Sequence, residues 1–132
     1  MGKKILIVDD DEQIALLLAS RLKANKYEIV VAYDGLQAVT QAFNEKPDLI
    51  LLDMKMPVSG GISVMDKLRH STYTALTPVI VITAYPSTEI QQKVKEMGAV
   101  DFISKPFKAE DMLPRIRKAL GEASGEEEGY DI

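Results

Sequence analysis

The sequence contains no cysteine, a single histidine and no long apolar run. Without cysteine the chain cannot form disulfide bonds or thiolate metal sites, which suits a cytoplasmic protein. The histidine, His70, follows an expected helix and has the pattern of a surface residue, so a histidine-based catalytic triad is not indicated. No run approaches the ~20 apolar residues of a membrane span, and the N-terminus lacks the pattern of a signal peptide. We therefore expect a cytoplasmic protein with no membrane segment.

The sequence also lacks an excess of basic residues. Of its 20 acidic residues, five lie within residues 122–132, which contain no lysine or arginine. The remaining 15 acidic residues nearly balance the 16 basic ones, so no basic face indicates direct binding of nucleic acid. The length fits one domain. We expect this domain to span residues 1–121, with a disordered acidic tail over residues 122–132.

Four short apolar runs and the segment 101–104 alternate with five segments of helical periodicity. The run Leu49–Leu52 lacks the alternation of a half-exposed strand and is typical of a strand buried on both faces of a parallel sheet. Short connections and right-handed crossovers then predict an α/β fold with a doubly wound, five-stranded parallel sheet. The expected strands are residues 5–8, 28–32, 49–53, 79–83 and 101–104.

Apolar residues at helical spacing indicate the buried side of each helix. In the first helix this pattern predicts that Ile14, Leu17, Leu18 and Leu22 face the core, and in the second helix it includes Phe43. Acidic and hydroxyl residues stand where helix N-caps are expected. These N-cap candidates are Asp10 or Asp11, Asp34, and Ser87 or Thr88.

Chemically active side chains stand at the expected carboxyl ends of four strands: Asp9 and Asp10, Asp53, Thr83, and Lys105. In open parallel sheets these ends share one edge, where ligands bind. Three carboxylates crowded there would repel one another, and a hard divalent cation such as Mg²⁺ removes that cost. A lysine and a hydroxyl can hold the oxygens of a phosphoryl group. Asp53 is the candidate nucleophile, which would form an acyl phosphate.

With these residues the chain resembles a receiver domain of two-component response regulators over roughly residues 3–120. Each matching piece alone is weak evidence, but together they occur in the order and spacing of that family. The resemblance implies a flavodoxin-like fold with strand order 2-1-3-4-5 and five helices. The matching pieces are Val8-Asp9-Asp10, Leu52-Asp53-Met54-Lys55-Met56-Pro57, Thr83-Ala84 and Lys105-Pro106-Phe107.

The resemblance implies that Asp53 is the phosphoacceptor. It implies a Mg²⁺ site, with Mn²⁺ as an alternative, in which Asp10 and Asp53 bind directly and Asp9 binds mainly through water. The backbone carbonyl of Lys55 would complete the protein ligands. The side chains of Lys55 and Tyr85 would flank the site and tune how fast water removes the phosphate. This Lys/Tyr pairing is similar to that of single-domain phosphorelay regulators, and we expect Tyr85 to shield the acyl phosphate.

Four further positions take their roles from the same resemblance. Thr83 and Lys105 would contact the phosphoryl group, and the peptide bond before Pro106 is a candidate for the cis form. Phosphorylation would draw Thr83 inward and turn the switch aromatic, Phe102, into the space that it vacates. Because Phe102 has no hydroxyl, packing alone would hold its inward state.

The resemblance also implies the partners. A sensor histidine kinase or a histidine phosphotransfer protein would supply the phosphate, and a downstream protein would dock on the surface of the fourth helix, fifth strand and fifth helix. Such a domain is not an enzyme acting on external substrates. Two alternatives stay open: a phosphate-independent binding module, and a Mg²⁺-dependent phosphatase. In that class of phosphatase an acid usually stands two residues beyond the nucleophile, where this chain has Lys55.

Overall fold

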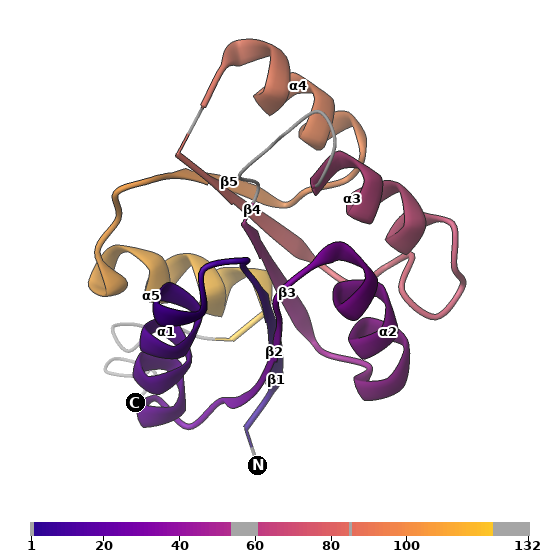
Figure 1. The fold of residues 1–132 in the computed structure, drawn as a ribbon. Helices are drawn as coiled ribbons and strands as arrows, with labels where there is room; N and C mark the ends of the chain where they lie inside the picture. Colours follow the sequence, from indigo (N-terminus) through magenta and orange to yellow (C-terminus); the bar gives the residue numbers. More distant parts are fainter. Residues whose placement is uncertain (1, 54–60, 85, 123–132) are drawn as a thin grey trace, which may run out of the picture.

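A five-stranded parallel sheet forms the centre of the structure, a computed structural model that describes residues 2–53, 61–84 and 86–122 (Figure 1). The strand order is β2-β1-β3-β4-β5, which confirms the predicted fold class. The expected acidic tail lies outside the described residues except for Glu122. The strands are β1 (Lys4–Val8), β2 (Glu28–Ala32), β3 (Leu49–Asp53), β4 (Val79–Thr83) and β5 (Asp101–Ser104).

Helices cover both faces of the sheet, as Figure 1 shows, with α1 and α5 on one face and α2, α3 and α4 on the other. Side chains of Asp11, Asp34 and Ser87 accept hydrogen bonds from backbone amides in the first turns of α1, α2 and α4. No described helix is long and apolar enough to cross a membrane. The helices are α1 (Glu12–Ala24), α2 (Gly35–Glu45), α3 (Ile62–Arg69), α4 (Thr88–Glu96) and α5 (Ala109–Ala119).

The central strands send alternate side chains to two separate apolar clusters. Ile5 and Ile7 of β1 pack toward α1 and α5, whereas Leu6 and Val8 pack toward α2, α3 and α4. This alternation follows from the two-residue period of a strand, and helices on both faces explain why every position in the run is apolar. The apolar run of each central strand stops at the carboxyl end of the strand, where polar side chains follow.

The predicted core face of α1 is partly wrong. Leu18 and Leu22 are buried, and Ala15 is buried beside them, but Ile14 is 36% exposed and Leu17 is 65% exposed. Small alanine side chains occupy the line of closest approach between the helix and the sheet. The prediction counted only the large apolar residues of α1. It therefore placed the buried side of the helix at the wrong angle around the helix axis. Ile14 and Leu17 lie instead near the functional edge described below.

Phe43 is also not a core residue, because 51% of its surface is exposed. Its ring packs edge-on against Tyr73, with centroids 5.1 Å apart and an interplanar angle of 78°. The neighbouring Ala42 is fully buried. Contact with Tyr73 at the surface thus partly covers the Phe43 ring without placing it in the core. Helical spacing alone does not indicate such a contact.

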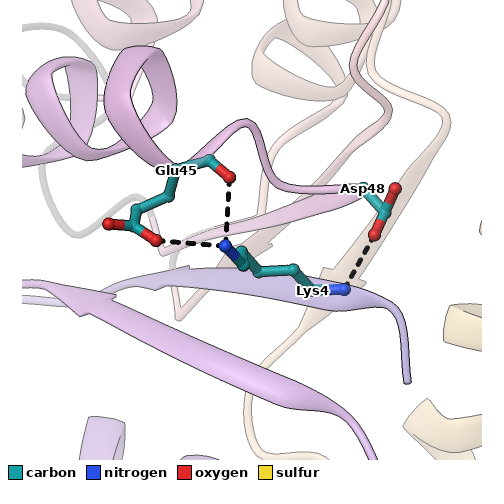
Figure 2. Close-up of polar contacts among 3 residues, drawn as sticks. All are labelled: Lys4, Glu45 and Asp48. Atoms are coloured by element: carbon teal, nitrogen blue, oxygen red, sulfur yellow. Dashed lines mark hydrogen bonds and ion pairs between the residues drawn. The ribbon is translucent and has the colours of Figure 1, made fainter. Parts of the chain in front are cut away.

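Polar contacts at the amino ends of β1 and β3 help to set the alignment of these strands (Figure 2). Lys4 Nζ donates to the carboxylate of Glu45 at 3.1 Å and to its backbone carbonyl at 3.3 Å. The backbone amide of Lys4 donates to Asp48 Oδ2 at 2.8 Å. With the amino ends tied, the parallel ladder runs to the pair Val8 and Leu52. The residues that follow this pair, Asp9 and Asp53, therefore stand side by side at the carboxyl end of the two strands.

Candidate functional site

Two aspartates meet where β1 and β3 end. Because Val8 and Leu52 are partners in the ladder, Asp9 and Asp53 emerge next to each other at the carboxyl edge. Each side chain is only 5% exposed. Asp9 Oδ1 accepts a hydrogen bond from the Asp11 backbone amide at 2.9 Å. Two neighbouring buried carboxylates are costly, so this arrangement needs a counter-charge.

Lys105 supplies part of that counter-charge from the far side of the edge. It follows β5, and its backbone amide donates to the carbonyl of Thr83 at 2.8 Å. Its ammonium forms an ion pair with Asp53 Oδ2 and lies 3.9 Å from Asp9 Oδ2. The Lys105–Pro106 peptide bond is cis. One lysine thus contacts both buried carboxylates.

The electrostatics show that one lysine does not neutralise the site. Burial raises the pKa of Asp53 to about 7, and contact with Asp9 adds to this increase, although the Lys105 ammonium opposes it. Burial lowers the pKa of Lys105, but Asp53, Asp9 and Asp10 outweigh burial and raise it overall. Asp10 is exposed but close enough for its charge to act on Lys105. In the described part of the edge, Asp9, Asp10 and Asp53 thus outnumber Lys105, and this excess of acidic groups favours binding of a cation.

The oxygen donors at this edge fit Mg²⁺. Within residues 2–53, 61–84 and 86–122, no three acidic or histidine side chains are placed as a ready-made metal centre. Mg²⁺ does not require one, because it keeps several waters and usually takes only one or two carboxylates from the protein. Asp9 and Asp53 provide such a pair, with Asp10 near them. Among the described residues at this edge the donors are hard oxygens, which favours Mg²⁺ over softer metals.

Thr83 and Phe102 occupy the neighbouring strands. Thr83 ends β4 and is fully buried, whereas Phe102 in β5 is half-buried and packs against the cluster under α2, α3 and α4. Their strands are adjacent, with Val81 opposite Phe102. The two other sequence-predicted positions, Lys55 and Tyr85, lie outside the described residues.

An apolar groove beside the carboxylates is the feature that sequence reasoning missed. It has a volume of about 680 Å³ and runs between α1 and the segment that follows β5. Ile14 and Leu17 form one wall, Pro106 and Phe107 the other, and Lys105 lies at its border with the acidic site. The signal was present: α1 has more large apolar residues than one buried helix face can use.

Comparison of the chain with protein families gives one match that covers most of it, the response regulator receiver domain, over residues 5–117. Among curated proteins, the transcriptional regulatory protein PhoP for alkaline phosphatase synthesis, from Bacillus subtilis, is 38% identical over 120 residues, which cover 91% of this chain and 49% of PhoP. The DNA-binding regulator RpaA of Synechocystis is 39% identical over 119 residues, covering 89% of this chain and 48% of RpaA. The chain thus spans about half the length of these relatives.

Solved structures agree with the fold. The chemotaxis protein CheY4 of Vibrio cholerae superposes with a TM-score of 0.84 at 30% identity, covering 90% of this chain and 99% of CheY4. The receiver domain of a sensor histidine kinase from Pseudomonas aeruginosa has a TM-score of 0.81 at 27% identity, covering 92% and 100%. That structure has a magnesium ion coordinated in its active-site cleft.

Proposed function

This chain belongs to the receiver-domain family of two-component response regulators, and on that premise we propose that Asp53 accepts a phosphoryl group from a phosphohistidine. The observation that carries this proposal is the position of the Asp53 carboxylate. It ends a buried strand at the open edge of the sheet, next to Asp9 and in an ion pair with Lys105. Among the described aspartates, Asp53 is the one whose carboxylate forms the closer ion pair with Lys105, and burial raises its pKa to about 7.

The chemistry follows from these neighbours. An oxygen of Asp53 attacks phosphorus while the bond from phosphorus to the imidazole nitrogen breaks, and the imidazole keeps the bonding electron pair. The ammonium of Lys105 pairs with the transferred oxygens instead of the free carboxylate. Asp9, Asp10, Asp53 and the Lys55 carbonyl would hold Mg²⁺, or Mn²⁺ in its place. The ion supplies neutralisation of charge that develops on the phosphoryl oxygens.

Phosphorylation then acts as a switch in this proposal. The acyl phosphate adds negative charge at the edge, and the buried Thr83, on the strand next to that of Asp53, would turn its hydroxyl toward it. Phe102 follows into the vacated space, which changes the surface of α4, β5 and α5, where a downstream protein would dock. We propose a signalling domain in the cytoplasm that turns over no external substrate. We place the domain at residues 1–121, followed by the acidic tail.

The groove between α1 and the segment after β5 is where we place the phosphohistidine donor. A donor protein must bring its imidazole to Asp53, and the groove lies next to Lys105, which contacts Asp53. Exposed Leu17 and half-buried Phe107 give the groove apolar walls for a partner's helix. A sensor kinase or a phosphotransfer protein would dock there with its histidine over the acidic site.

Incubation with acetyl phosphate and Mg²⁺, followed by intact-mass measurement, tests the phosphoacceptor. The parent chain should gain one phosphoryl group, and the Asp53→Asn variant should gain none, because an amide cannot form the acyl phosphate. The matched control is Asp66→Asn, which makes the same substitution at an exposed position on α3. Phosphorylation of Asp53→Asn at the rate of the parent would disprove the assignment.

Replacing Tyr85 should shorten the life of the phosphorylated form. We expect Tyr85→Ala to lose phosphate roughly tenfold faster than the parent, because in this proposal the aromatic side chain would shield the acyl phosphate from in-line water. The rate is measured as loss of the phosphorylated mass after removal of acetyl phosphate. Tyr73→Ala, at an exposed tyrosine, is the control. An unchanged lifetime in Tyr85→Ala would rule out the shielding role.

A further inference from the structure

Arg69, the last residue of α3, joins three segments at the edge of the sheet opposite the acidic site. Its guanidinium donates hydrogen bonds to five backbone carbonyls. Nη1 contacts the carbonyls of Thr74, Ala75 and Thr77 at 3.3, 3.2 and 2.9 Å, while Nε contacts Met97 at 3.1 Å and Nη2 contacts Gly98 at 3.2 Å. Three of these carbonyls precede β4, and the other two end α4.

A glycine just after α4 allows the close contact between this segment and the Arg69 guanidinium. Gly98 has φ +92°, a left-handed conformation, and a Cβ at this position would approach Arg69 Nε to 3.2 Å. The backbone turn thus brings two carbonyls onto one cation. Burial lowers the pKa of Arg69. An arginine guanidinium stays protonated in proteins, so the charge that favours these contacts persists.

Few side chains of α4 are buried. Val94 is the one fully buried side chain in this helix, and Ile90 is only partly buried. The N-terminal turn is closed locally, by Ser87 Oγ accepting from the amide of Ile90 at 3.1 Å. The guanidinium is therefore one attachment of the C-terminal end of α4, beside the Val100 amide, which donates to the carbonyl of Val79 at 2.9 Å.

The two ends of α4 have different neighbours. The N-terminal end follows Thr83 and Ala84 from the carboxyl end of β4, where the acidic site lies, while the C-terminal end is held by Arg69 beside the amino end of β4. We propose that Arg69 is the pivot of α4: it fixes the C-terminal end, so that phosphorylation moves the N-terminal end. This inference rests on the proposed phosphorylation of Asp53 and adds the point about which the helix turns.

Amide hydrogen exchange in the parent chain, with and without acetyl phosphate and Mg²⁺, measures the two ends separately. The reporters are the hydrogen-bonded amides of Ile90 and Gln91 at the N-terminal end, and those of Gly98 and Ala99 at the C-terminal end. We expect phosphorylation to change the exchange rates of the first pair by about tenfold or more and those of the second pair by less than about twofold. Equal changes at both ends would overturn the pivot.

Variants of Arg69 test the cause. Arg69→Met keeps the apolar stem but loses the guanidinium, and Arg69→Lys keeps the charge but cannot reach both groups of carbonyls. In both, exchange at Gly98 and Ala99 should be faster by about tenfold or more even without phosphate. The control, Lys67→Met, removes an exposed cation from the same helix and should match the parent.

Phosphorylated variants provide the decisive comparison. In Arg69→Lys and Arg69→Met, the change caused by phosphorylation should spread to Gly98 and Ala99, an effect that a merely stabilising contact would not produce. If it stays confined to Ile90 and Gln91, the pivot is wrong even though phosphorylation stands. Intact mass, recorded on the same samples, shows separately whether Asp53 accepts phosphate. If Asp53 does not accept phosphate, the unphosphorylated variants still test Arg69. Exchange at Gly98 equal to that of the parent would show that Arg69 does not fix the C-terminal end of α4.

Discussion

Without metal ions, the Asp53→Asn variant should be more stable than the parent at pH 8 and should lose most of the parent's dependence on pH between about 4 and 7. The pKa of Asp53 is about 7 in the folded chain, against an ordinary value of 3.8. Between these values the folded state binds more protons than the unfolded state does. The free energy of unfolding therefore falls as pH rises through this window and stays low above it.

The expected size of this effect is about 1–3 kcal/mol, allowing for partial screening by solvent. Urea unfolding in EDTA at several pH values measures it, with Asp66→Asn as the control for removal of one exposed charge. Added Mg²⁺ should stabilise the parent more than Asp53→Asn, since the ion offsets the repulsion that the substitution removes. A less stable Asp53→Asn with an unchanged pH slope would mean that repulsion between the carboxylates is not the dominant cost.

Substitution of Leu17 should weaken docking of the phosphohistidine donor without affecting phosphorylation of Asp53 by a small molecule. We expect Leu17→Gln to slow phosphotransfer from an autophosphorylated histidine kinase by roughly 10–100-fold, the effect of losing one apolar anchor at an interface. Phosphorylation by acetyl phosphate should be unchanged, because the small donor needs no groove. Leu17 is 65% exposed, so its replacement removes little core packing.

The neighbouring leucine provides a closely matched control. Leu16 is 55% exposed but does not line the groove. Leu16→Gln makes the same chemical change one residue away and should transfer phosphate at the parent's rate. The comparison uses a kinase that phosphorylates the parent chain, and it follows the phosphorylated mass over time. Equal rates for Leu16→Gln and Leu17→Gln would remove the groove from the donor interface.

The positions that the sequence predicted best are those where local chemistry and fold agree. All five strands lie within one residue of their expected bounds. Four of them contain apolar runs of four residues, which have few other ways to be buried. Of the alternative caps, Asp11 and Ser87 are the ones used. Each accepts from an amide three residues ahead, a choice between adjacent residues that only the backbone direction decides.

The predictions were wrong where a helix has more apolar residues than its buried face can hold. Ile14 and Leu17 satisfied the helical pattern as well as Leu18 did, and Ala15 looked neutral. The sheet approached the alanine side of α1, which left two large apolar residues outside. Arg69 had no sequence signal at all, since its partners are backbone carbonyls from segments that no side-chain pattern marks.

The order of residues by itself determined the alternation of strands and helices, and with it the edge at which Asp9, Asp53, Thr83 and Lys105 stand. Burial of apolar runs and the length of the connections require this much. Tertiary structure alone decided which carboxylates touch Lys105, which side of α1 stays outside, and which carbonyls surround Arg69. These outcomes depend on distances of a few ångströms between segments far apart in the chain, and no local pattern encodes such distances.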